Sequence, residues 1–131
     1  MARRKTRTLT ELELEIMQVV WKHGEATVEE IRRALDAENK PLALPSVRTM
    51  LSILQSKGYV TRREDGRRHV YRPRVSQDRA RKSILKDVVE RAFEGSVLDL
   101  VAALIDTRMV SKGELDEVWR LIRQARKDGS P

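Results

Sequence analysis

Residues 59–73, YVTRREDGRRHVYRP, constrain the fold of this chain more than any other segment. Apolar or aromatic residues alternate with polar ones on both sides of an Asp65-Gly66 pair, which is the usual sequence signal for a short β-hairpin. Five arginines fall within residues 61–73, so the predicted hairpin is strongly basic. Such a hairpin is either a solvated, charge-rich turn or a finger that contacts an acidic partner, and the surrounding sequence bears on the choice.

Two helical patterns follow a basic arm at residues 1–7. Thr8 and Glu11 have capping-box spacing before the first pattern, and Gly24 ends it. Thr27 and Glu30 repeat the capping-box spacing before a short second helix. Each helix is predicted to turn one face toward a core. The apolar positions at helical spacing are Leu9, Leu12, Ile16, Val19 and Val20 in the first helix and Val28, Ile31 and Leu35 in the second.

A third helix is predicted over residues 45–57, just before Gly58. Pro45 suits its first turn, where the missing N–H costs nothing, although Leu44 offers no side-chain oxygen for a cap. Three helices and a hairpin within about 65 residues form the order of a winged helix-turn-helix. We therefore predict a mainly α protein whose residues 1–75 form a winged helix-turn-helix domain.

Residues 76–131 are predicted to form a second domain of three helices. Three apolar stripes follow one another there, and Ser111 with Glu114 has capping-box spacing before the last. Three such helices would bury little apolar surface alone, so a second copy of the chain is the expected partner, and folding back onto the first domain is the alternative. The side chains expected at the dimer contact are Val88, Leu98, Val101, Leu104, Leu115, Val118, Trp119 and Ile122.

Composition argues against several classes of function. The chain has no cysteine, which excludes disulfides, thiolate metal sites and cysteine nucleophiles. Its two histidines, His23 and His69, have no metal-ligand spacing, and there is no nucleotide-binding or nucleophile motif. We therefore expect no enzyme activity, no metal and no cofactor. No apolar run approaches the roughly 18 residues of a membrane span, so a cytoplasmic protein without membrane insertion is expected.

Positive charge is concentrated at one end of the chain. Residues 1–74 carry 16 lysines and arginines against ten acidic residues, whereas residues 95–131 carry six of each. The net charge of the whole chain is +7. A basic half joined to a neutral half favours an acidic polymer as partner of the first domain and a protein contact for the second.

The third helix has the surface expected of a helix that reads DNA. One sector is apolar and must face the core, and the opposite sector carries small polar residues with one long cation. Small hydroxyl side chains let a helix lie deep in a major groove, where Ser and Thr bond base edges or phosphates. A bland hydroxyl-rich surface is the alternative. The predicted DNA-binding residues of this helix are Ser46, Arg48, Thr49 and Ser52.

A hairpin after such a helix is predicted to be the wing, with arginines along the phosphate backbone. Alternation places Arg62 and Glu64 on one face of the hairpin and Arg63 on the other. Arg67 and Arg68 at the tip are the strongest phosphate candidates. The predicted DNA contacts of the wing are Arg62, Arg63, Arg67 and Arg68, and the residues expected to pack it onto the helices are Tyr59, Val60, Val70 and Tyr71.

The chain resembles the penicillinase-repressor family, the BlaI/MecI/CopY transcriptional repressors. The similarity runs from about Leu9 to Ala125 and is carried by SVRTMLSILQSKGYVTRRED, by FEGSVLDLVAALID and by SKGELDEVWRLIRQ. The resemblance implies a homodimeric repressor on a palindromic DNA operator, often upstream of resistance or stress genes. The family's recognition-helix hydroxyls and arginine fall here on Ser46, Arg48 and Thr49.

The resemblance also implies a route of induction. In one branch of the family a membrane sensor metalloprotease leads to cleavage within the dimerisation helices, and the nearest matching bond here is Asp99–Leu100. Those relatives have Asn-Phe at the bond, and this chain does not. The copper branch senses metal through a cysteine-rich tail, which RQARKDGSP lacks. Copper sensing by that chemistry is therefore excluded.

Two other functions compete with a protease-induced repressor. In a ligand-responsive regulator, a small molecule between the two domains would change DNA affinity, which requires a lined pocket. A winged helix can also serve protein contacts alone. That function predicts no salt-dependent DNA binding, whereas a dimer that contacts phosphates loses affinity steeply as salt rises.

Overall fold

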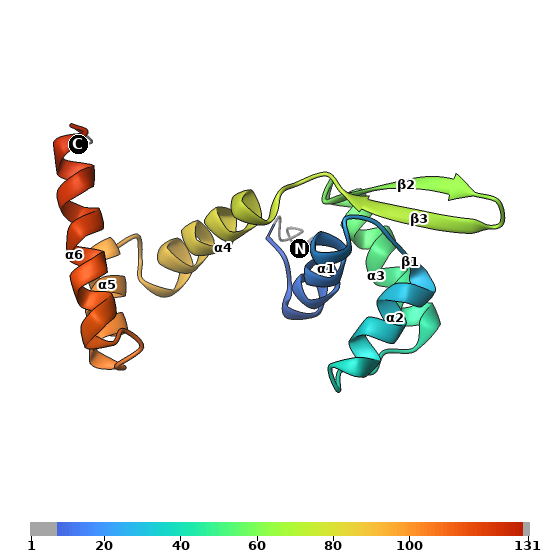
Figure 1. Cartoon of the computed structure of the whole chain (residues 1–131), viewed down its shortest axis with the longest axis horizontal. Helices are drawn as coiled ribbons and strands as arrows, with labels where there is room; N and C mark the ends of the chain where they lie inside the picture. Colours follow the sequence, from blue (N-terminus) through green and yellow to red (C-terminus); the bar gives the residue numbers. More distant parts are fainter. Residues whose placement is uncertain (1–7, 130–131) are drawn as a thin grey trace, which may run out of the picture. The chain divides into compact units, whose positions relative to one another are not determined.

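The computed structural model describes residues 8–129, and the basic arm expected at residues 1–7 lies outside them. The described residues form six helices and one three-stranded sheet, which confirms a mainly α fold. They divide into a winged-helix unit that ends at Asp87 and a C-terminal unit that begins at Val88. The elements (Figure 1) are α1 (Glu11–His23), β1 (Ala26–Thr27), α2 (Val28–Ala37), α3 (Leu44–Ser56), β2 (Val60–Asp65), β3 (Arg68–Pro73), α4 (Gln77–Ala92), α5 (Val97–Asp106) and α6 (Lys112–Lys127).

The sheet contains the predicted hairpin and one strand that the sequence did not predict. The strand order is β1-β3-β2, and both pairings are antiparallel. β2 and β3 pair as far as Asp65 opposite Arg68, so the loop is Gly66–Arg67, one residue later than the expected Asp65-Gly66 turn. Gly66 has φ +64° at the first loop position, a conformation that glycine adopts without strain. The short β1 adds Ala26 opposite Tyr71 and completes a winged-helix fold.

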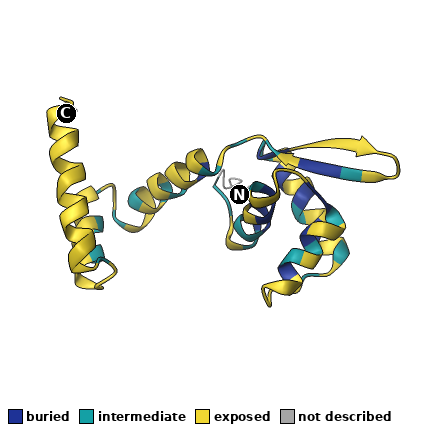
Figure 2. Cartoon of the chain, viewed as in Figure 1, coloured by how far each residue is buried: buried dark blue, intermediate teal, exposed yellow. Residues whose placement is uncertain are grey.

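The core of the winged-helix unit lies where α1, α2 and α3 meet the sheet. Figure 2 shows its buried positions on these elements. Burying each large aliphatic side chain stabilises the fold by roughly 1.5–3 kcal/mol. Tyr59, Val60, Val70 and Tyr71 are all buried, which confirms that the base of the wing packs on the helices. The fully buried aliphatic side chains are Ile16, Met17, Val20, Ile31, Leu35, Val47, Leu51 and Leu54.

The cap predicted for α1 is wrong by two residues. Thr10 is the N-cap: its hydroxyl accepts from the Glu13 N–H at 3.3 Å, and its own N–H donates to Glu13 Oε1 at 2.7 Å. The Thr8 and Glu11 pair has the same spacing, so sequence spacing alone did not distinguish the two pairs.

A buried ion pair links α1 to the end of α3. Lys57 Nζ lies 2.8 Å from Glu13 Oε1, and Glu13 is 1% exposed. Burial raises the pKa of the Glu13 carboxyl, but the hydrogen bonds from Lys57 and Thr10 outweigh it, so the pKa lies below its usual value. Glu13 therefore stays charged at neutral pH, and its partner is in place.

The other helix starts follow the sequence closely. Thr27 with Glu30 and Ser111 with Glu114 both form complete capping boxes, as predicted. α3 begins after Ala43 without a side-chain cap, and Pro45 lies in its first turn. The helix spans Leu44–Ser56, one residue earlier at each end than predicted. Gly24, with φ +80°, ends α1 as expected.

The C-terminal unit has the predicted helices but no enclosed core. No described residue of α5 or α6 is buried, as the absence of dark blue on these helices in Figure 2 illustrates. Within residues 8–129, no helix combines the length and apolar character that crossing a bilayer requires. α4 continues through the division between the units, so the boundary expected after residue 75 stays a prediction. The large apolar side chains exposed from Val88 onward are Val88, Val97, Leu98, Val101, Ile105, Met109, Leu115, Val118, Trp119, Leu121 and Ile122.

Candidate nucleic-acid interface

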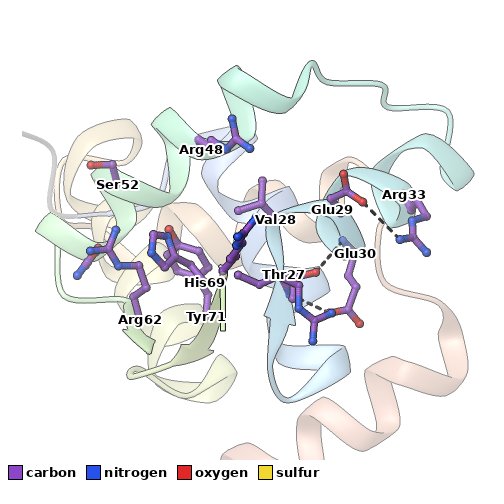
Figure 3. Close-up of a pocket in the computed structure, with 13 residues that line it drawn as sticks. Thr27, Val28, Glu29, Glu30, Arg33, Arg48, Ser52, Arg62, His69 and Tyr71 are labelled. Atoms are coloured by element: carbon purple, nitrogen blue, oxygen red, sulfur yellow. Dashed lines mark hydrogen bonds and ion pairs between the residues drawn. The ribbon is translucent and has the colours of Figure 1, made fainter. Parts of the chain in front are cut away.

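A basic cleft of about 630 Å³ lies between α3, the wing and the start of α2. Figure 3 shows Arg48 and Ser52 projecting from α3, with Arg62, His69 and Tyr71 on the hairpin. Three short elements thus bring their side chains to one concave surface of the winged-helix unit. The lining residues are Thr27, Val28, Glu29, Glu30, Arg33, Arg48, Ser52, Gln55, Arg62, Arg67, Arg68, His69 and Tyr71.

The cleft gathers five of the eight residues predicted to bind DNA. They are Arg48, Ser52, Arg62, Arg67 and Arg68. Ser46, Thr49 and Arg63 are exposed but do not line it. The fold thus brings five of the predicted residues together at one cleft and leaves three on the adjoining surface, and their role in DNA binding stays a prediction.

The exposed surface of α3 has two parts with different chemistry. Arg48, Ser52 and Gln55 follow one another at helical spacing and line the cleft. Ser46 and Thr49 lie elsewhere on the exposed surface of the same helix. The Thr49 hydroxyl donates to the carbonyl oxygen of Pro45 at 3.0 Å, so its proton is used within the helix. Toward a ligand, Thr49 therefore offers a methyl group and an acceptor rather than a donor.

The wing arginines are divided by the alternation of the strands. Arg62 lies on the cleft side, whereas Arg63 forms an ion pair with Glu25 at 2.9 Å. Arg68 pairs with Asp65 across the tip at 3.3 Å. Within residues 8–129, Arg48, Arg62 and Arg67 form no salt bridge. These three guanidinium groups therefore face the cleft without a carboxylate partner.

Acidic groups at the start of α2 border the same cleft. Glu29 pairs with Arg33 at 3.7 Å, and Glu30 closes the capping box with Thr27. The hydrogen bonds from the Thr27 backbone and hydroxyl lower the pKa of Glu30, with smaller contributions from His23 and Arg68. Glu30 is thus charged at neutral pH, and both glutamates already have a partner on α2 or at its cap.

Sequence reasoning missed several cleft residues. Arg33 and Gln55 were not among the predicted contacts, although Gln55 lies at helical spacing from Arg48 and Ser52, a signal that could have found it. His69 was not among the predicted DNA contacts either. It lines the cleft, and its Nε2 lies 3.9 Å from Glu64 Oε1. The sequence could not predict which face of the hairpin lies toward α2, because that depends on the pairing of β1 with β3.

The positions predicted for a dimer contact and for cleavage lie in or near the C-terminal helices. Of the dimer positions only Leu104 is half-buried, and the remaining seven are exposed. Asp99 and Leu100 lie in the first turn of α5, where the Asp99 N–H donates to the Ser96 hydroxyl at 3.1 Å. Asp99 is exposed and Leu100 half-buried. The bond between them is thus part of a capped helix.

Comparison with known proteins connects this architecture to one family. Residues 9–124 match the sequence profile described as penicillinase repressor. The penicillinase repressor of Bacillus licheniformis is 23% identical over 121 residues, 92% of this chain and 94% of its own. The methicillin resistance regulatory protein MecI of Staphylococcus aureus is 23% identical over 124 residues, 92% and 97% of the two chains. A solved structure of H. salinarum RosR, 17% identical, covers 95% of this chain and 99% of its own with a TM-score of 0.50, a likeness of fold alone.

Proposed function

Because the chain belongs to the penicillinase repressor family, we propose that it represses transcription as a homodimer on a palindromic DNA operator. The family consists of DNA-binding transcriptional repressors, so the chain is a repressor and not an enzyme. The dimer, the symmetric operator and the mode of induction are the parts of this function that we infer. We place the protein in the cytoplasm, where such an operator is accessible.

The observation that carries the DNA-binding assignment is the basic cleft beside α3. Arg48, Arg62 and Arg67 line it from α3 and the wing and have no carboxylate partner among residues 8–129, so their charges are available to an anion. A sugar–phosphate backbone running between a recognition helix and a wing would supply the matching charge. We therefore assign the cleft arginines, together with Arg68 and Ser52, to phosphate contacts.

Reading of base sequence is assigned to the part of α3 outside the cleft. Ser46 and Thr49 are small and exposed, which allows close approach to base edges in a major groove. Thr49 would accept a hydrogen bond from an adenine or cytosine amino group or place its methyl group against thymine. Arg63 is held by Glu25 and must exchange that partner before it can contact a phosphate.

The dimer is supported by the exposed apolar surface of the C-terminal unit. Leu98 is 78% exposed, Trp119 is 54% exposed, and no described residue of α5 or α6 is buried. A solvated monomer rarely carries so many large apolar side chains on three consecutive helices. A second copy would cover them symmetrically. Once one winged-helix unit of the dimer is bound to its half-site, the other would be held at high effective concentration near the second half-site.

Induction is proposed to act on this same surface. Cleavage at or near Asp99–Leu100, at the end of a pathway from a membrane sensor metalloprotease, would separate α6 and most of α5 from the winged-helix unit. The Ser96 cap would have to open first, because proteases act on extended rather than helical backbone. Loss of Val118, Trp119 and Ile122 from the DNA-bound fragment would weaken the dimer and release the operator.

The experiment that tests the proposed function is a salt titration of binding to DNA from the region upstream of the gene, with a shuffled fragment as control. The account expects tight binding to the upstream DNA only, with affinity falling steeply as salt rises. Equal binding to both fragments would contradict a specific operator there. An absence of binding to either would favour protein contacts as the function of the winged helix.

A further inference from the structure

Helix α4 belongs to two units. Its first three turns pack within the winged-helix unit, and the helix then continues without a break to Ala92. Ala80 is 1% exposed, and Ile84 and Asp87 follow it on the same helix face as half-buried residues. Leu85, by contrast, is 52% exposed. The first part of α4 is therefore packed as a fixed element of the winged-helix unit.

Backbone and side-chain hydrogen bonds hold the entrance to this helix. The indole N–H of Trp21 in α1 donates to the carbonyl oxygen of Val75 at 2.9 Å. The Arg74 N–H donates to the carbonyl oxygen of Tyr59 at 2.8 Å. The connection between β3 and α4 is thus held on one side by α1 and on the other by the residue that precedes β2.

Lys57 at the end of α3 joins this arrangement to the recognition helix. Besides its ion pair with Glu13, its Nζ donates to the carbonyl oxygen of Thr8 at 3.3 Å. The Thr8 hydroxyl in turn donates to Asp87 Oδ2 at 3.5 Å. A chain of contacts therefore runs from the C-terminal end of α3 through Thr8 to the third turn of α4.

A second route starts two residues later. Tyr59 is 6% exposed, lies near the Glu13 carboxylate, and has a side-chain hydrogen bond with Ser83 of α4. Burial raises the pKa of the Tyr59 hydroxyl, with a further contribution from the Glu13 charge, so this group stays neutral. Both routes start from the same short segment after α3, and Glu13 lies beside each.

We propose that Lys57, with Glu13, Thr8 and Tyr59, acts as a positioning group that fixes the direction in which α4 leaves the winged-helix unit. The inference rests on the proposed dimer, because α4 leads toward the surface assigned to the second copy. Its consequence is that these residues set the half-site spacing that the dimer accepts, although none of them is assigned to contact DNA.

The length of α4 makes this consequence large enough to measure. Sixteen residues of helix extend about 24 Å at 1.5 Å per residue, so a tilt of about 10° at the base moves the far end by roughly 4 Å. One base pair along DNA corresponds to about 3.4 Å. Loosening the anchor by such an angle would therefore let the dimer accept operators that differ by about one base pair in spacing.

The test compares three proteins on the identified operator, on a single half-site, and on operators whose spacing is changed by one or two base pairs. The first variant, Thr8→Val with Tyr59→Phe, removes both hydrogen bonds to α4 and leaves the Glu13–Lys57 pair intact. The second, Glu13→Gln with Lys57→Met, removes the pair without leaving a lone buried charge. The matched control is Lys40→Met, which breaks another ion pair of α1, Lys40 with Glu15 at 3.4 Å.

We expect wild type and the control to lose about tenfold or more in affinity when the spacing changes by one base pair, because both half-sites must be engaged together. Both double variants should lose less than about threefold, while their single half-site affinity stays within about twofold of wild type. Double variants that keep the wild-type dependence of affinity on spacing would overturn the inference. Equal losses of affinity on the single half-site and on the full operator would also overturn it, because they would mean that the winged-helix unit itself is damaged. A wild-type protein without spacing preference would instead contradict the proposed dimer.

Discussion

The two units of this chain differ in how far one copy of the chain buries their apolar side chains. The winged-helix unit encloses most of its large apolar side chains within a single copy, and Leu51, Leu54 and Ile31 are fully buried there. The C-terminal unit has comparable apolar stripes, yet no described residue of α5 or α6 is buried. Amphipathic periodicity therefore predicts that a helix has an apolar face, but not whether the same chain or a second copy covers it.

The largest expected effect comes from removing the unit that has no core. A chain ended at residue 95 keeps α1–α4 and loses α5 and α6. We expect it to be a folded monomer whose affinity for the full operator falls about 10²–10⁴-fold, because the two half-sites no longer bind as one event. Electrophoretic mobility shift with the intact chain alongside measures this. A truncated chain that binds as tightly as the full chain would contradict the dimer.

The next effect contrasts a leucine from each unit. Leu51→Ala should lower the free energy of unfolding by roughly 2–5 kcal/mol, because it leaves a cavity in an enclosed core. Leu98→Ala, at a position 78% exposed in one chain, should leave the unfolding of the winged-helix unit within about 0.5 kcal/mol of wild type and weaken self-association instead. Denaturant unfolding at several protein concentrations separates the two. Equal, concentration-independent losses would remove the contrast.

A smaller effect separates reading from anchoring within the DNA interface. Thr49→Ala should reduce discrimination between the operator and single-base variants by about 1–3 kcal/mol if Thr49 contacts a base. Arg67→Ala should weaken binding to all sequences alike and reduce the salt dependence by about one phosphate contact. Competition binding over a set of operator variants measures both. The opposite pattern would exchange the roles of α3 and the wing.

The smallest expected effect is the pH dependence that the Glu13–Lys57 pair confers. The pKa of Glu13 is lowered in the folded state, so its contribution to stability is present above the usual pKa of a glutamate and is lost as the pH falls through the lowered value. In the Glu13→Gln variant the free energy of unfolding should therefore fall less steeply as the pH is lowered. Thermal unfolding between neutral and acidic pH tests this, and an unchanged acid slope in the variant would show that other carboxylates dominate.

Much of this architecture could be predicted because its signals are local. The capping boxes at Thr27 and Ser111, the glycine after α1 and the alternation of the wing each depend on neighbours in the sequence. The same reasoning placed Arg48, Ser52 and Arg62 on elements that do meet at one cleft. Local chemistry was sufficient for these features, because their partners lie within a few positions along the sequence.

The parts that could not be predicted depend on partners far along the chain. The buried carboxylate of Glu13 is paired by Lys57, which lies 44 residues further along the chain. Arg63 is paired because Glu25 lies opposite the wing, a contact that follows from β1 joining β3. The two-residue β1 is too short to leave a pattern of its own, so periodicity could not predict the Arg63–Glu25 contact.

The central claim, that a second copy completes the C-terminal unit, is tested most directly by sedimentation equilibrium of the intact chain at moderate salt. We expect a species of twice the 15.2 kDa chain mass that dissociates on dilution. A mass of 15.2 kDa at every concentration, in a protein that still binds its operator tightly, would contradict it.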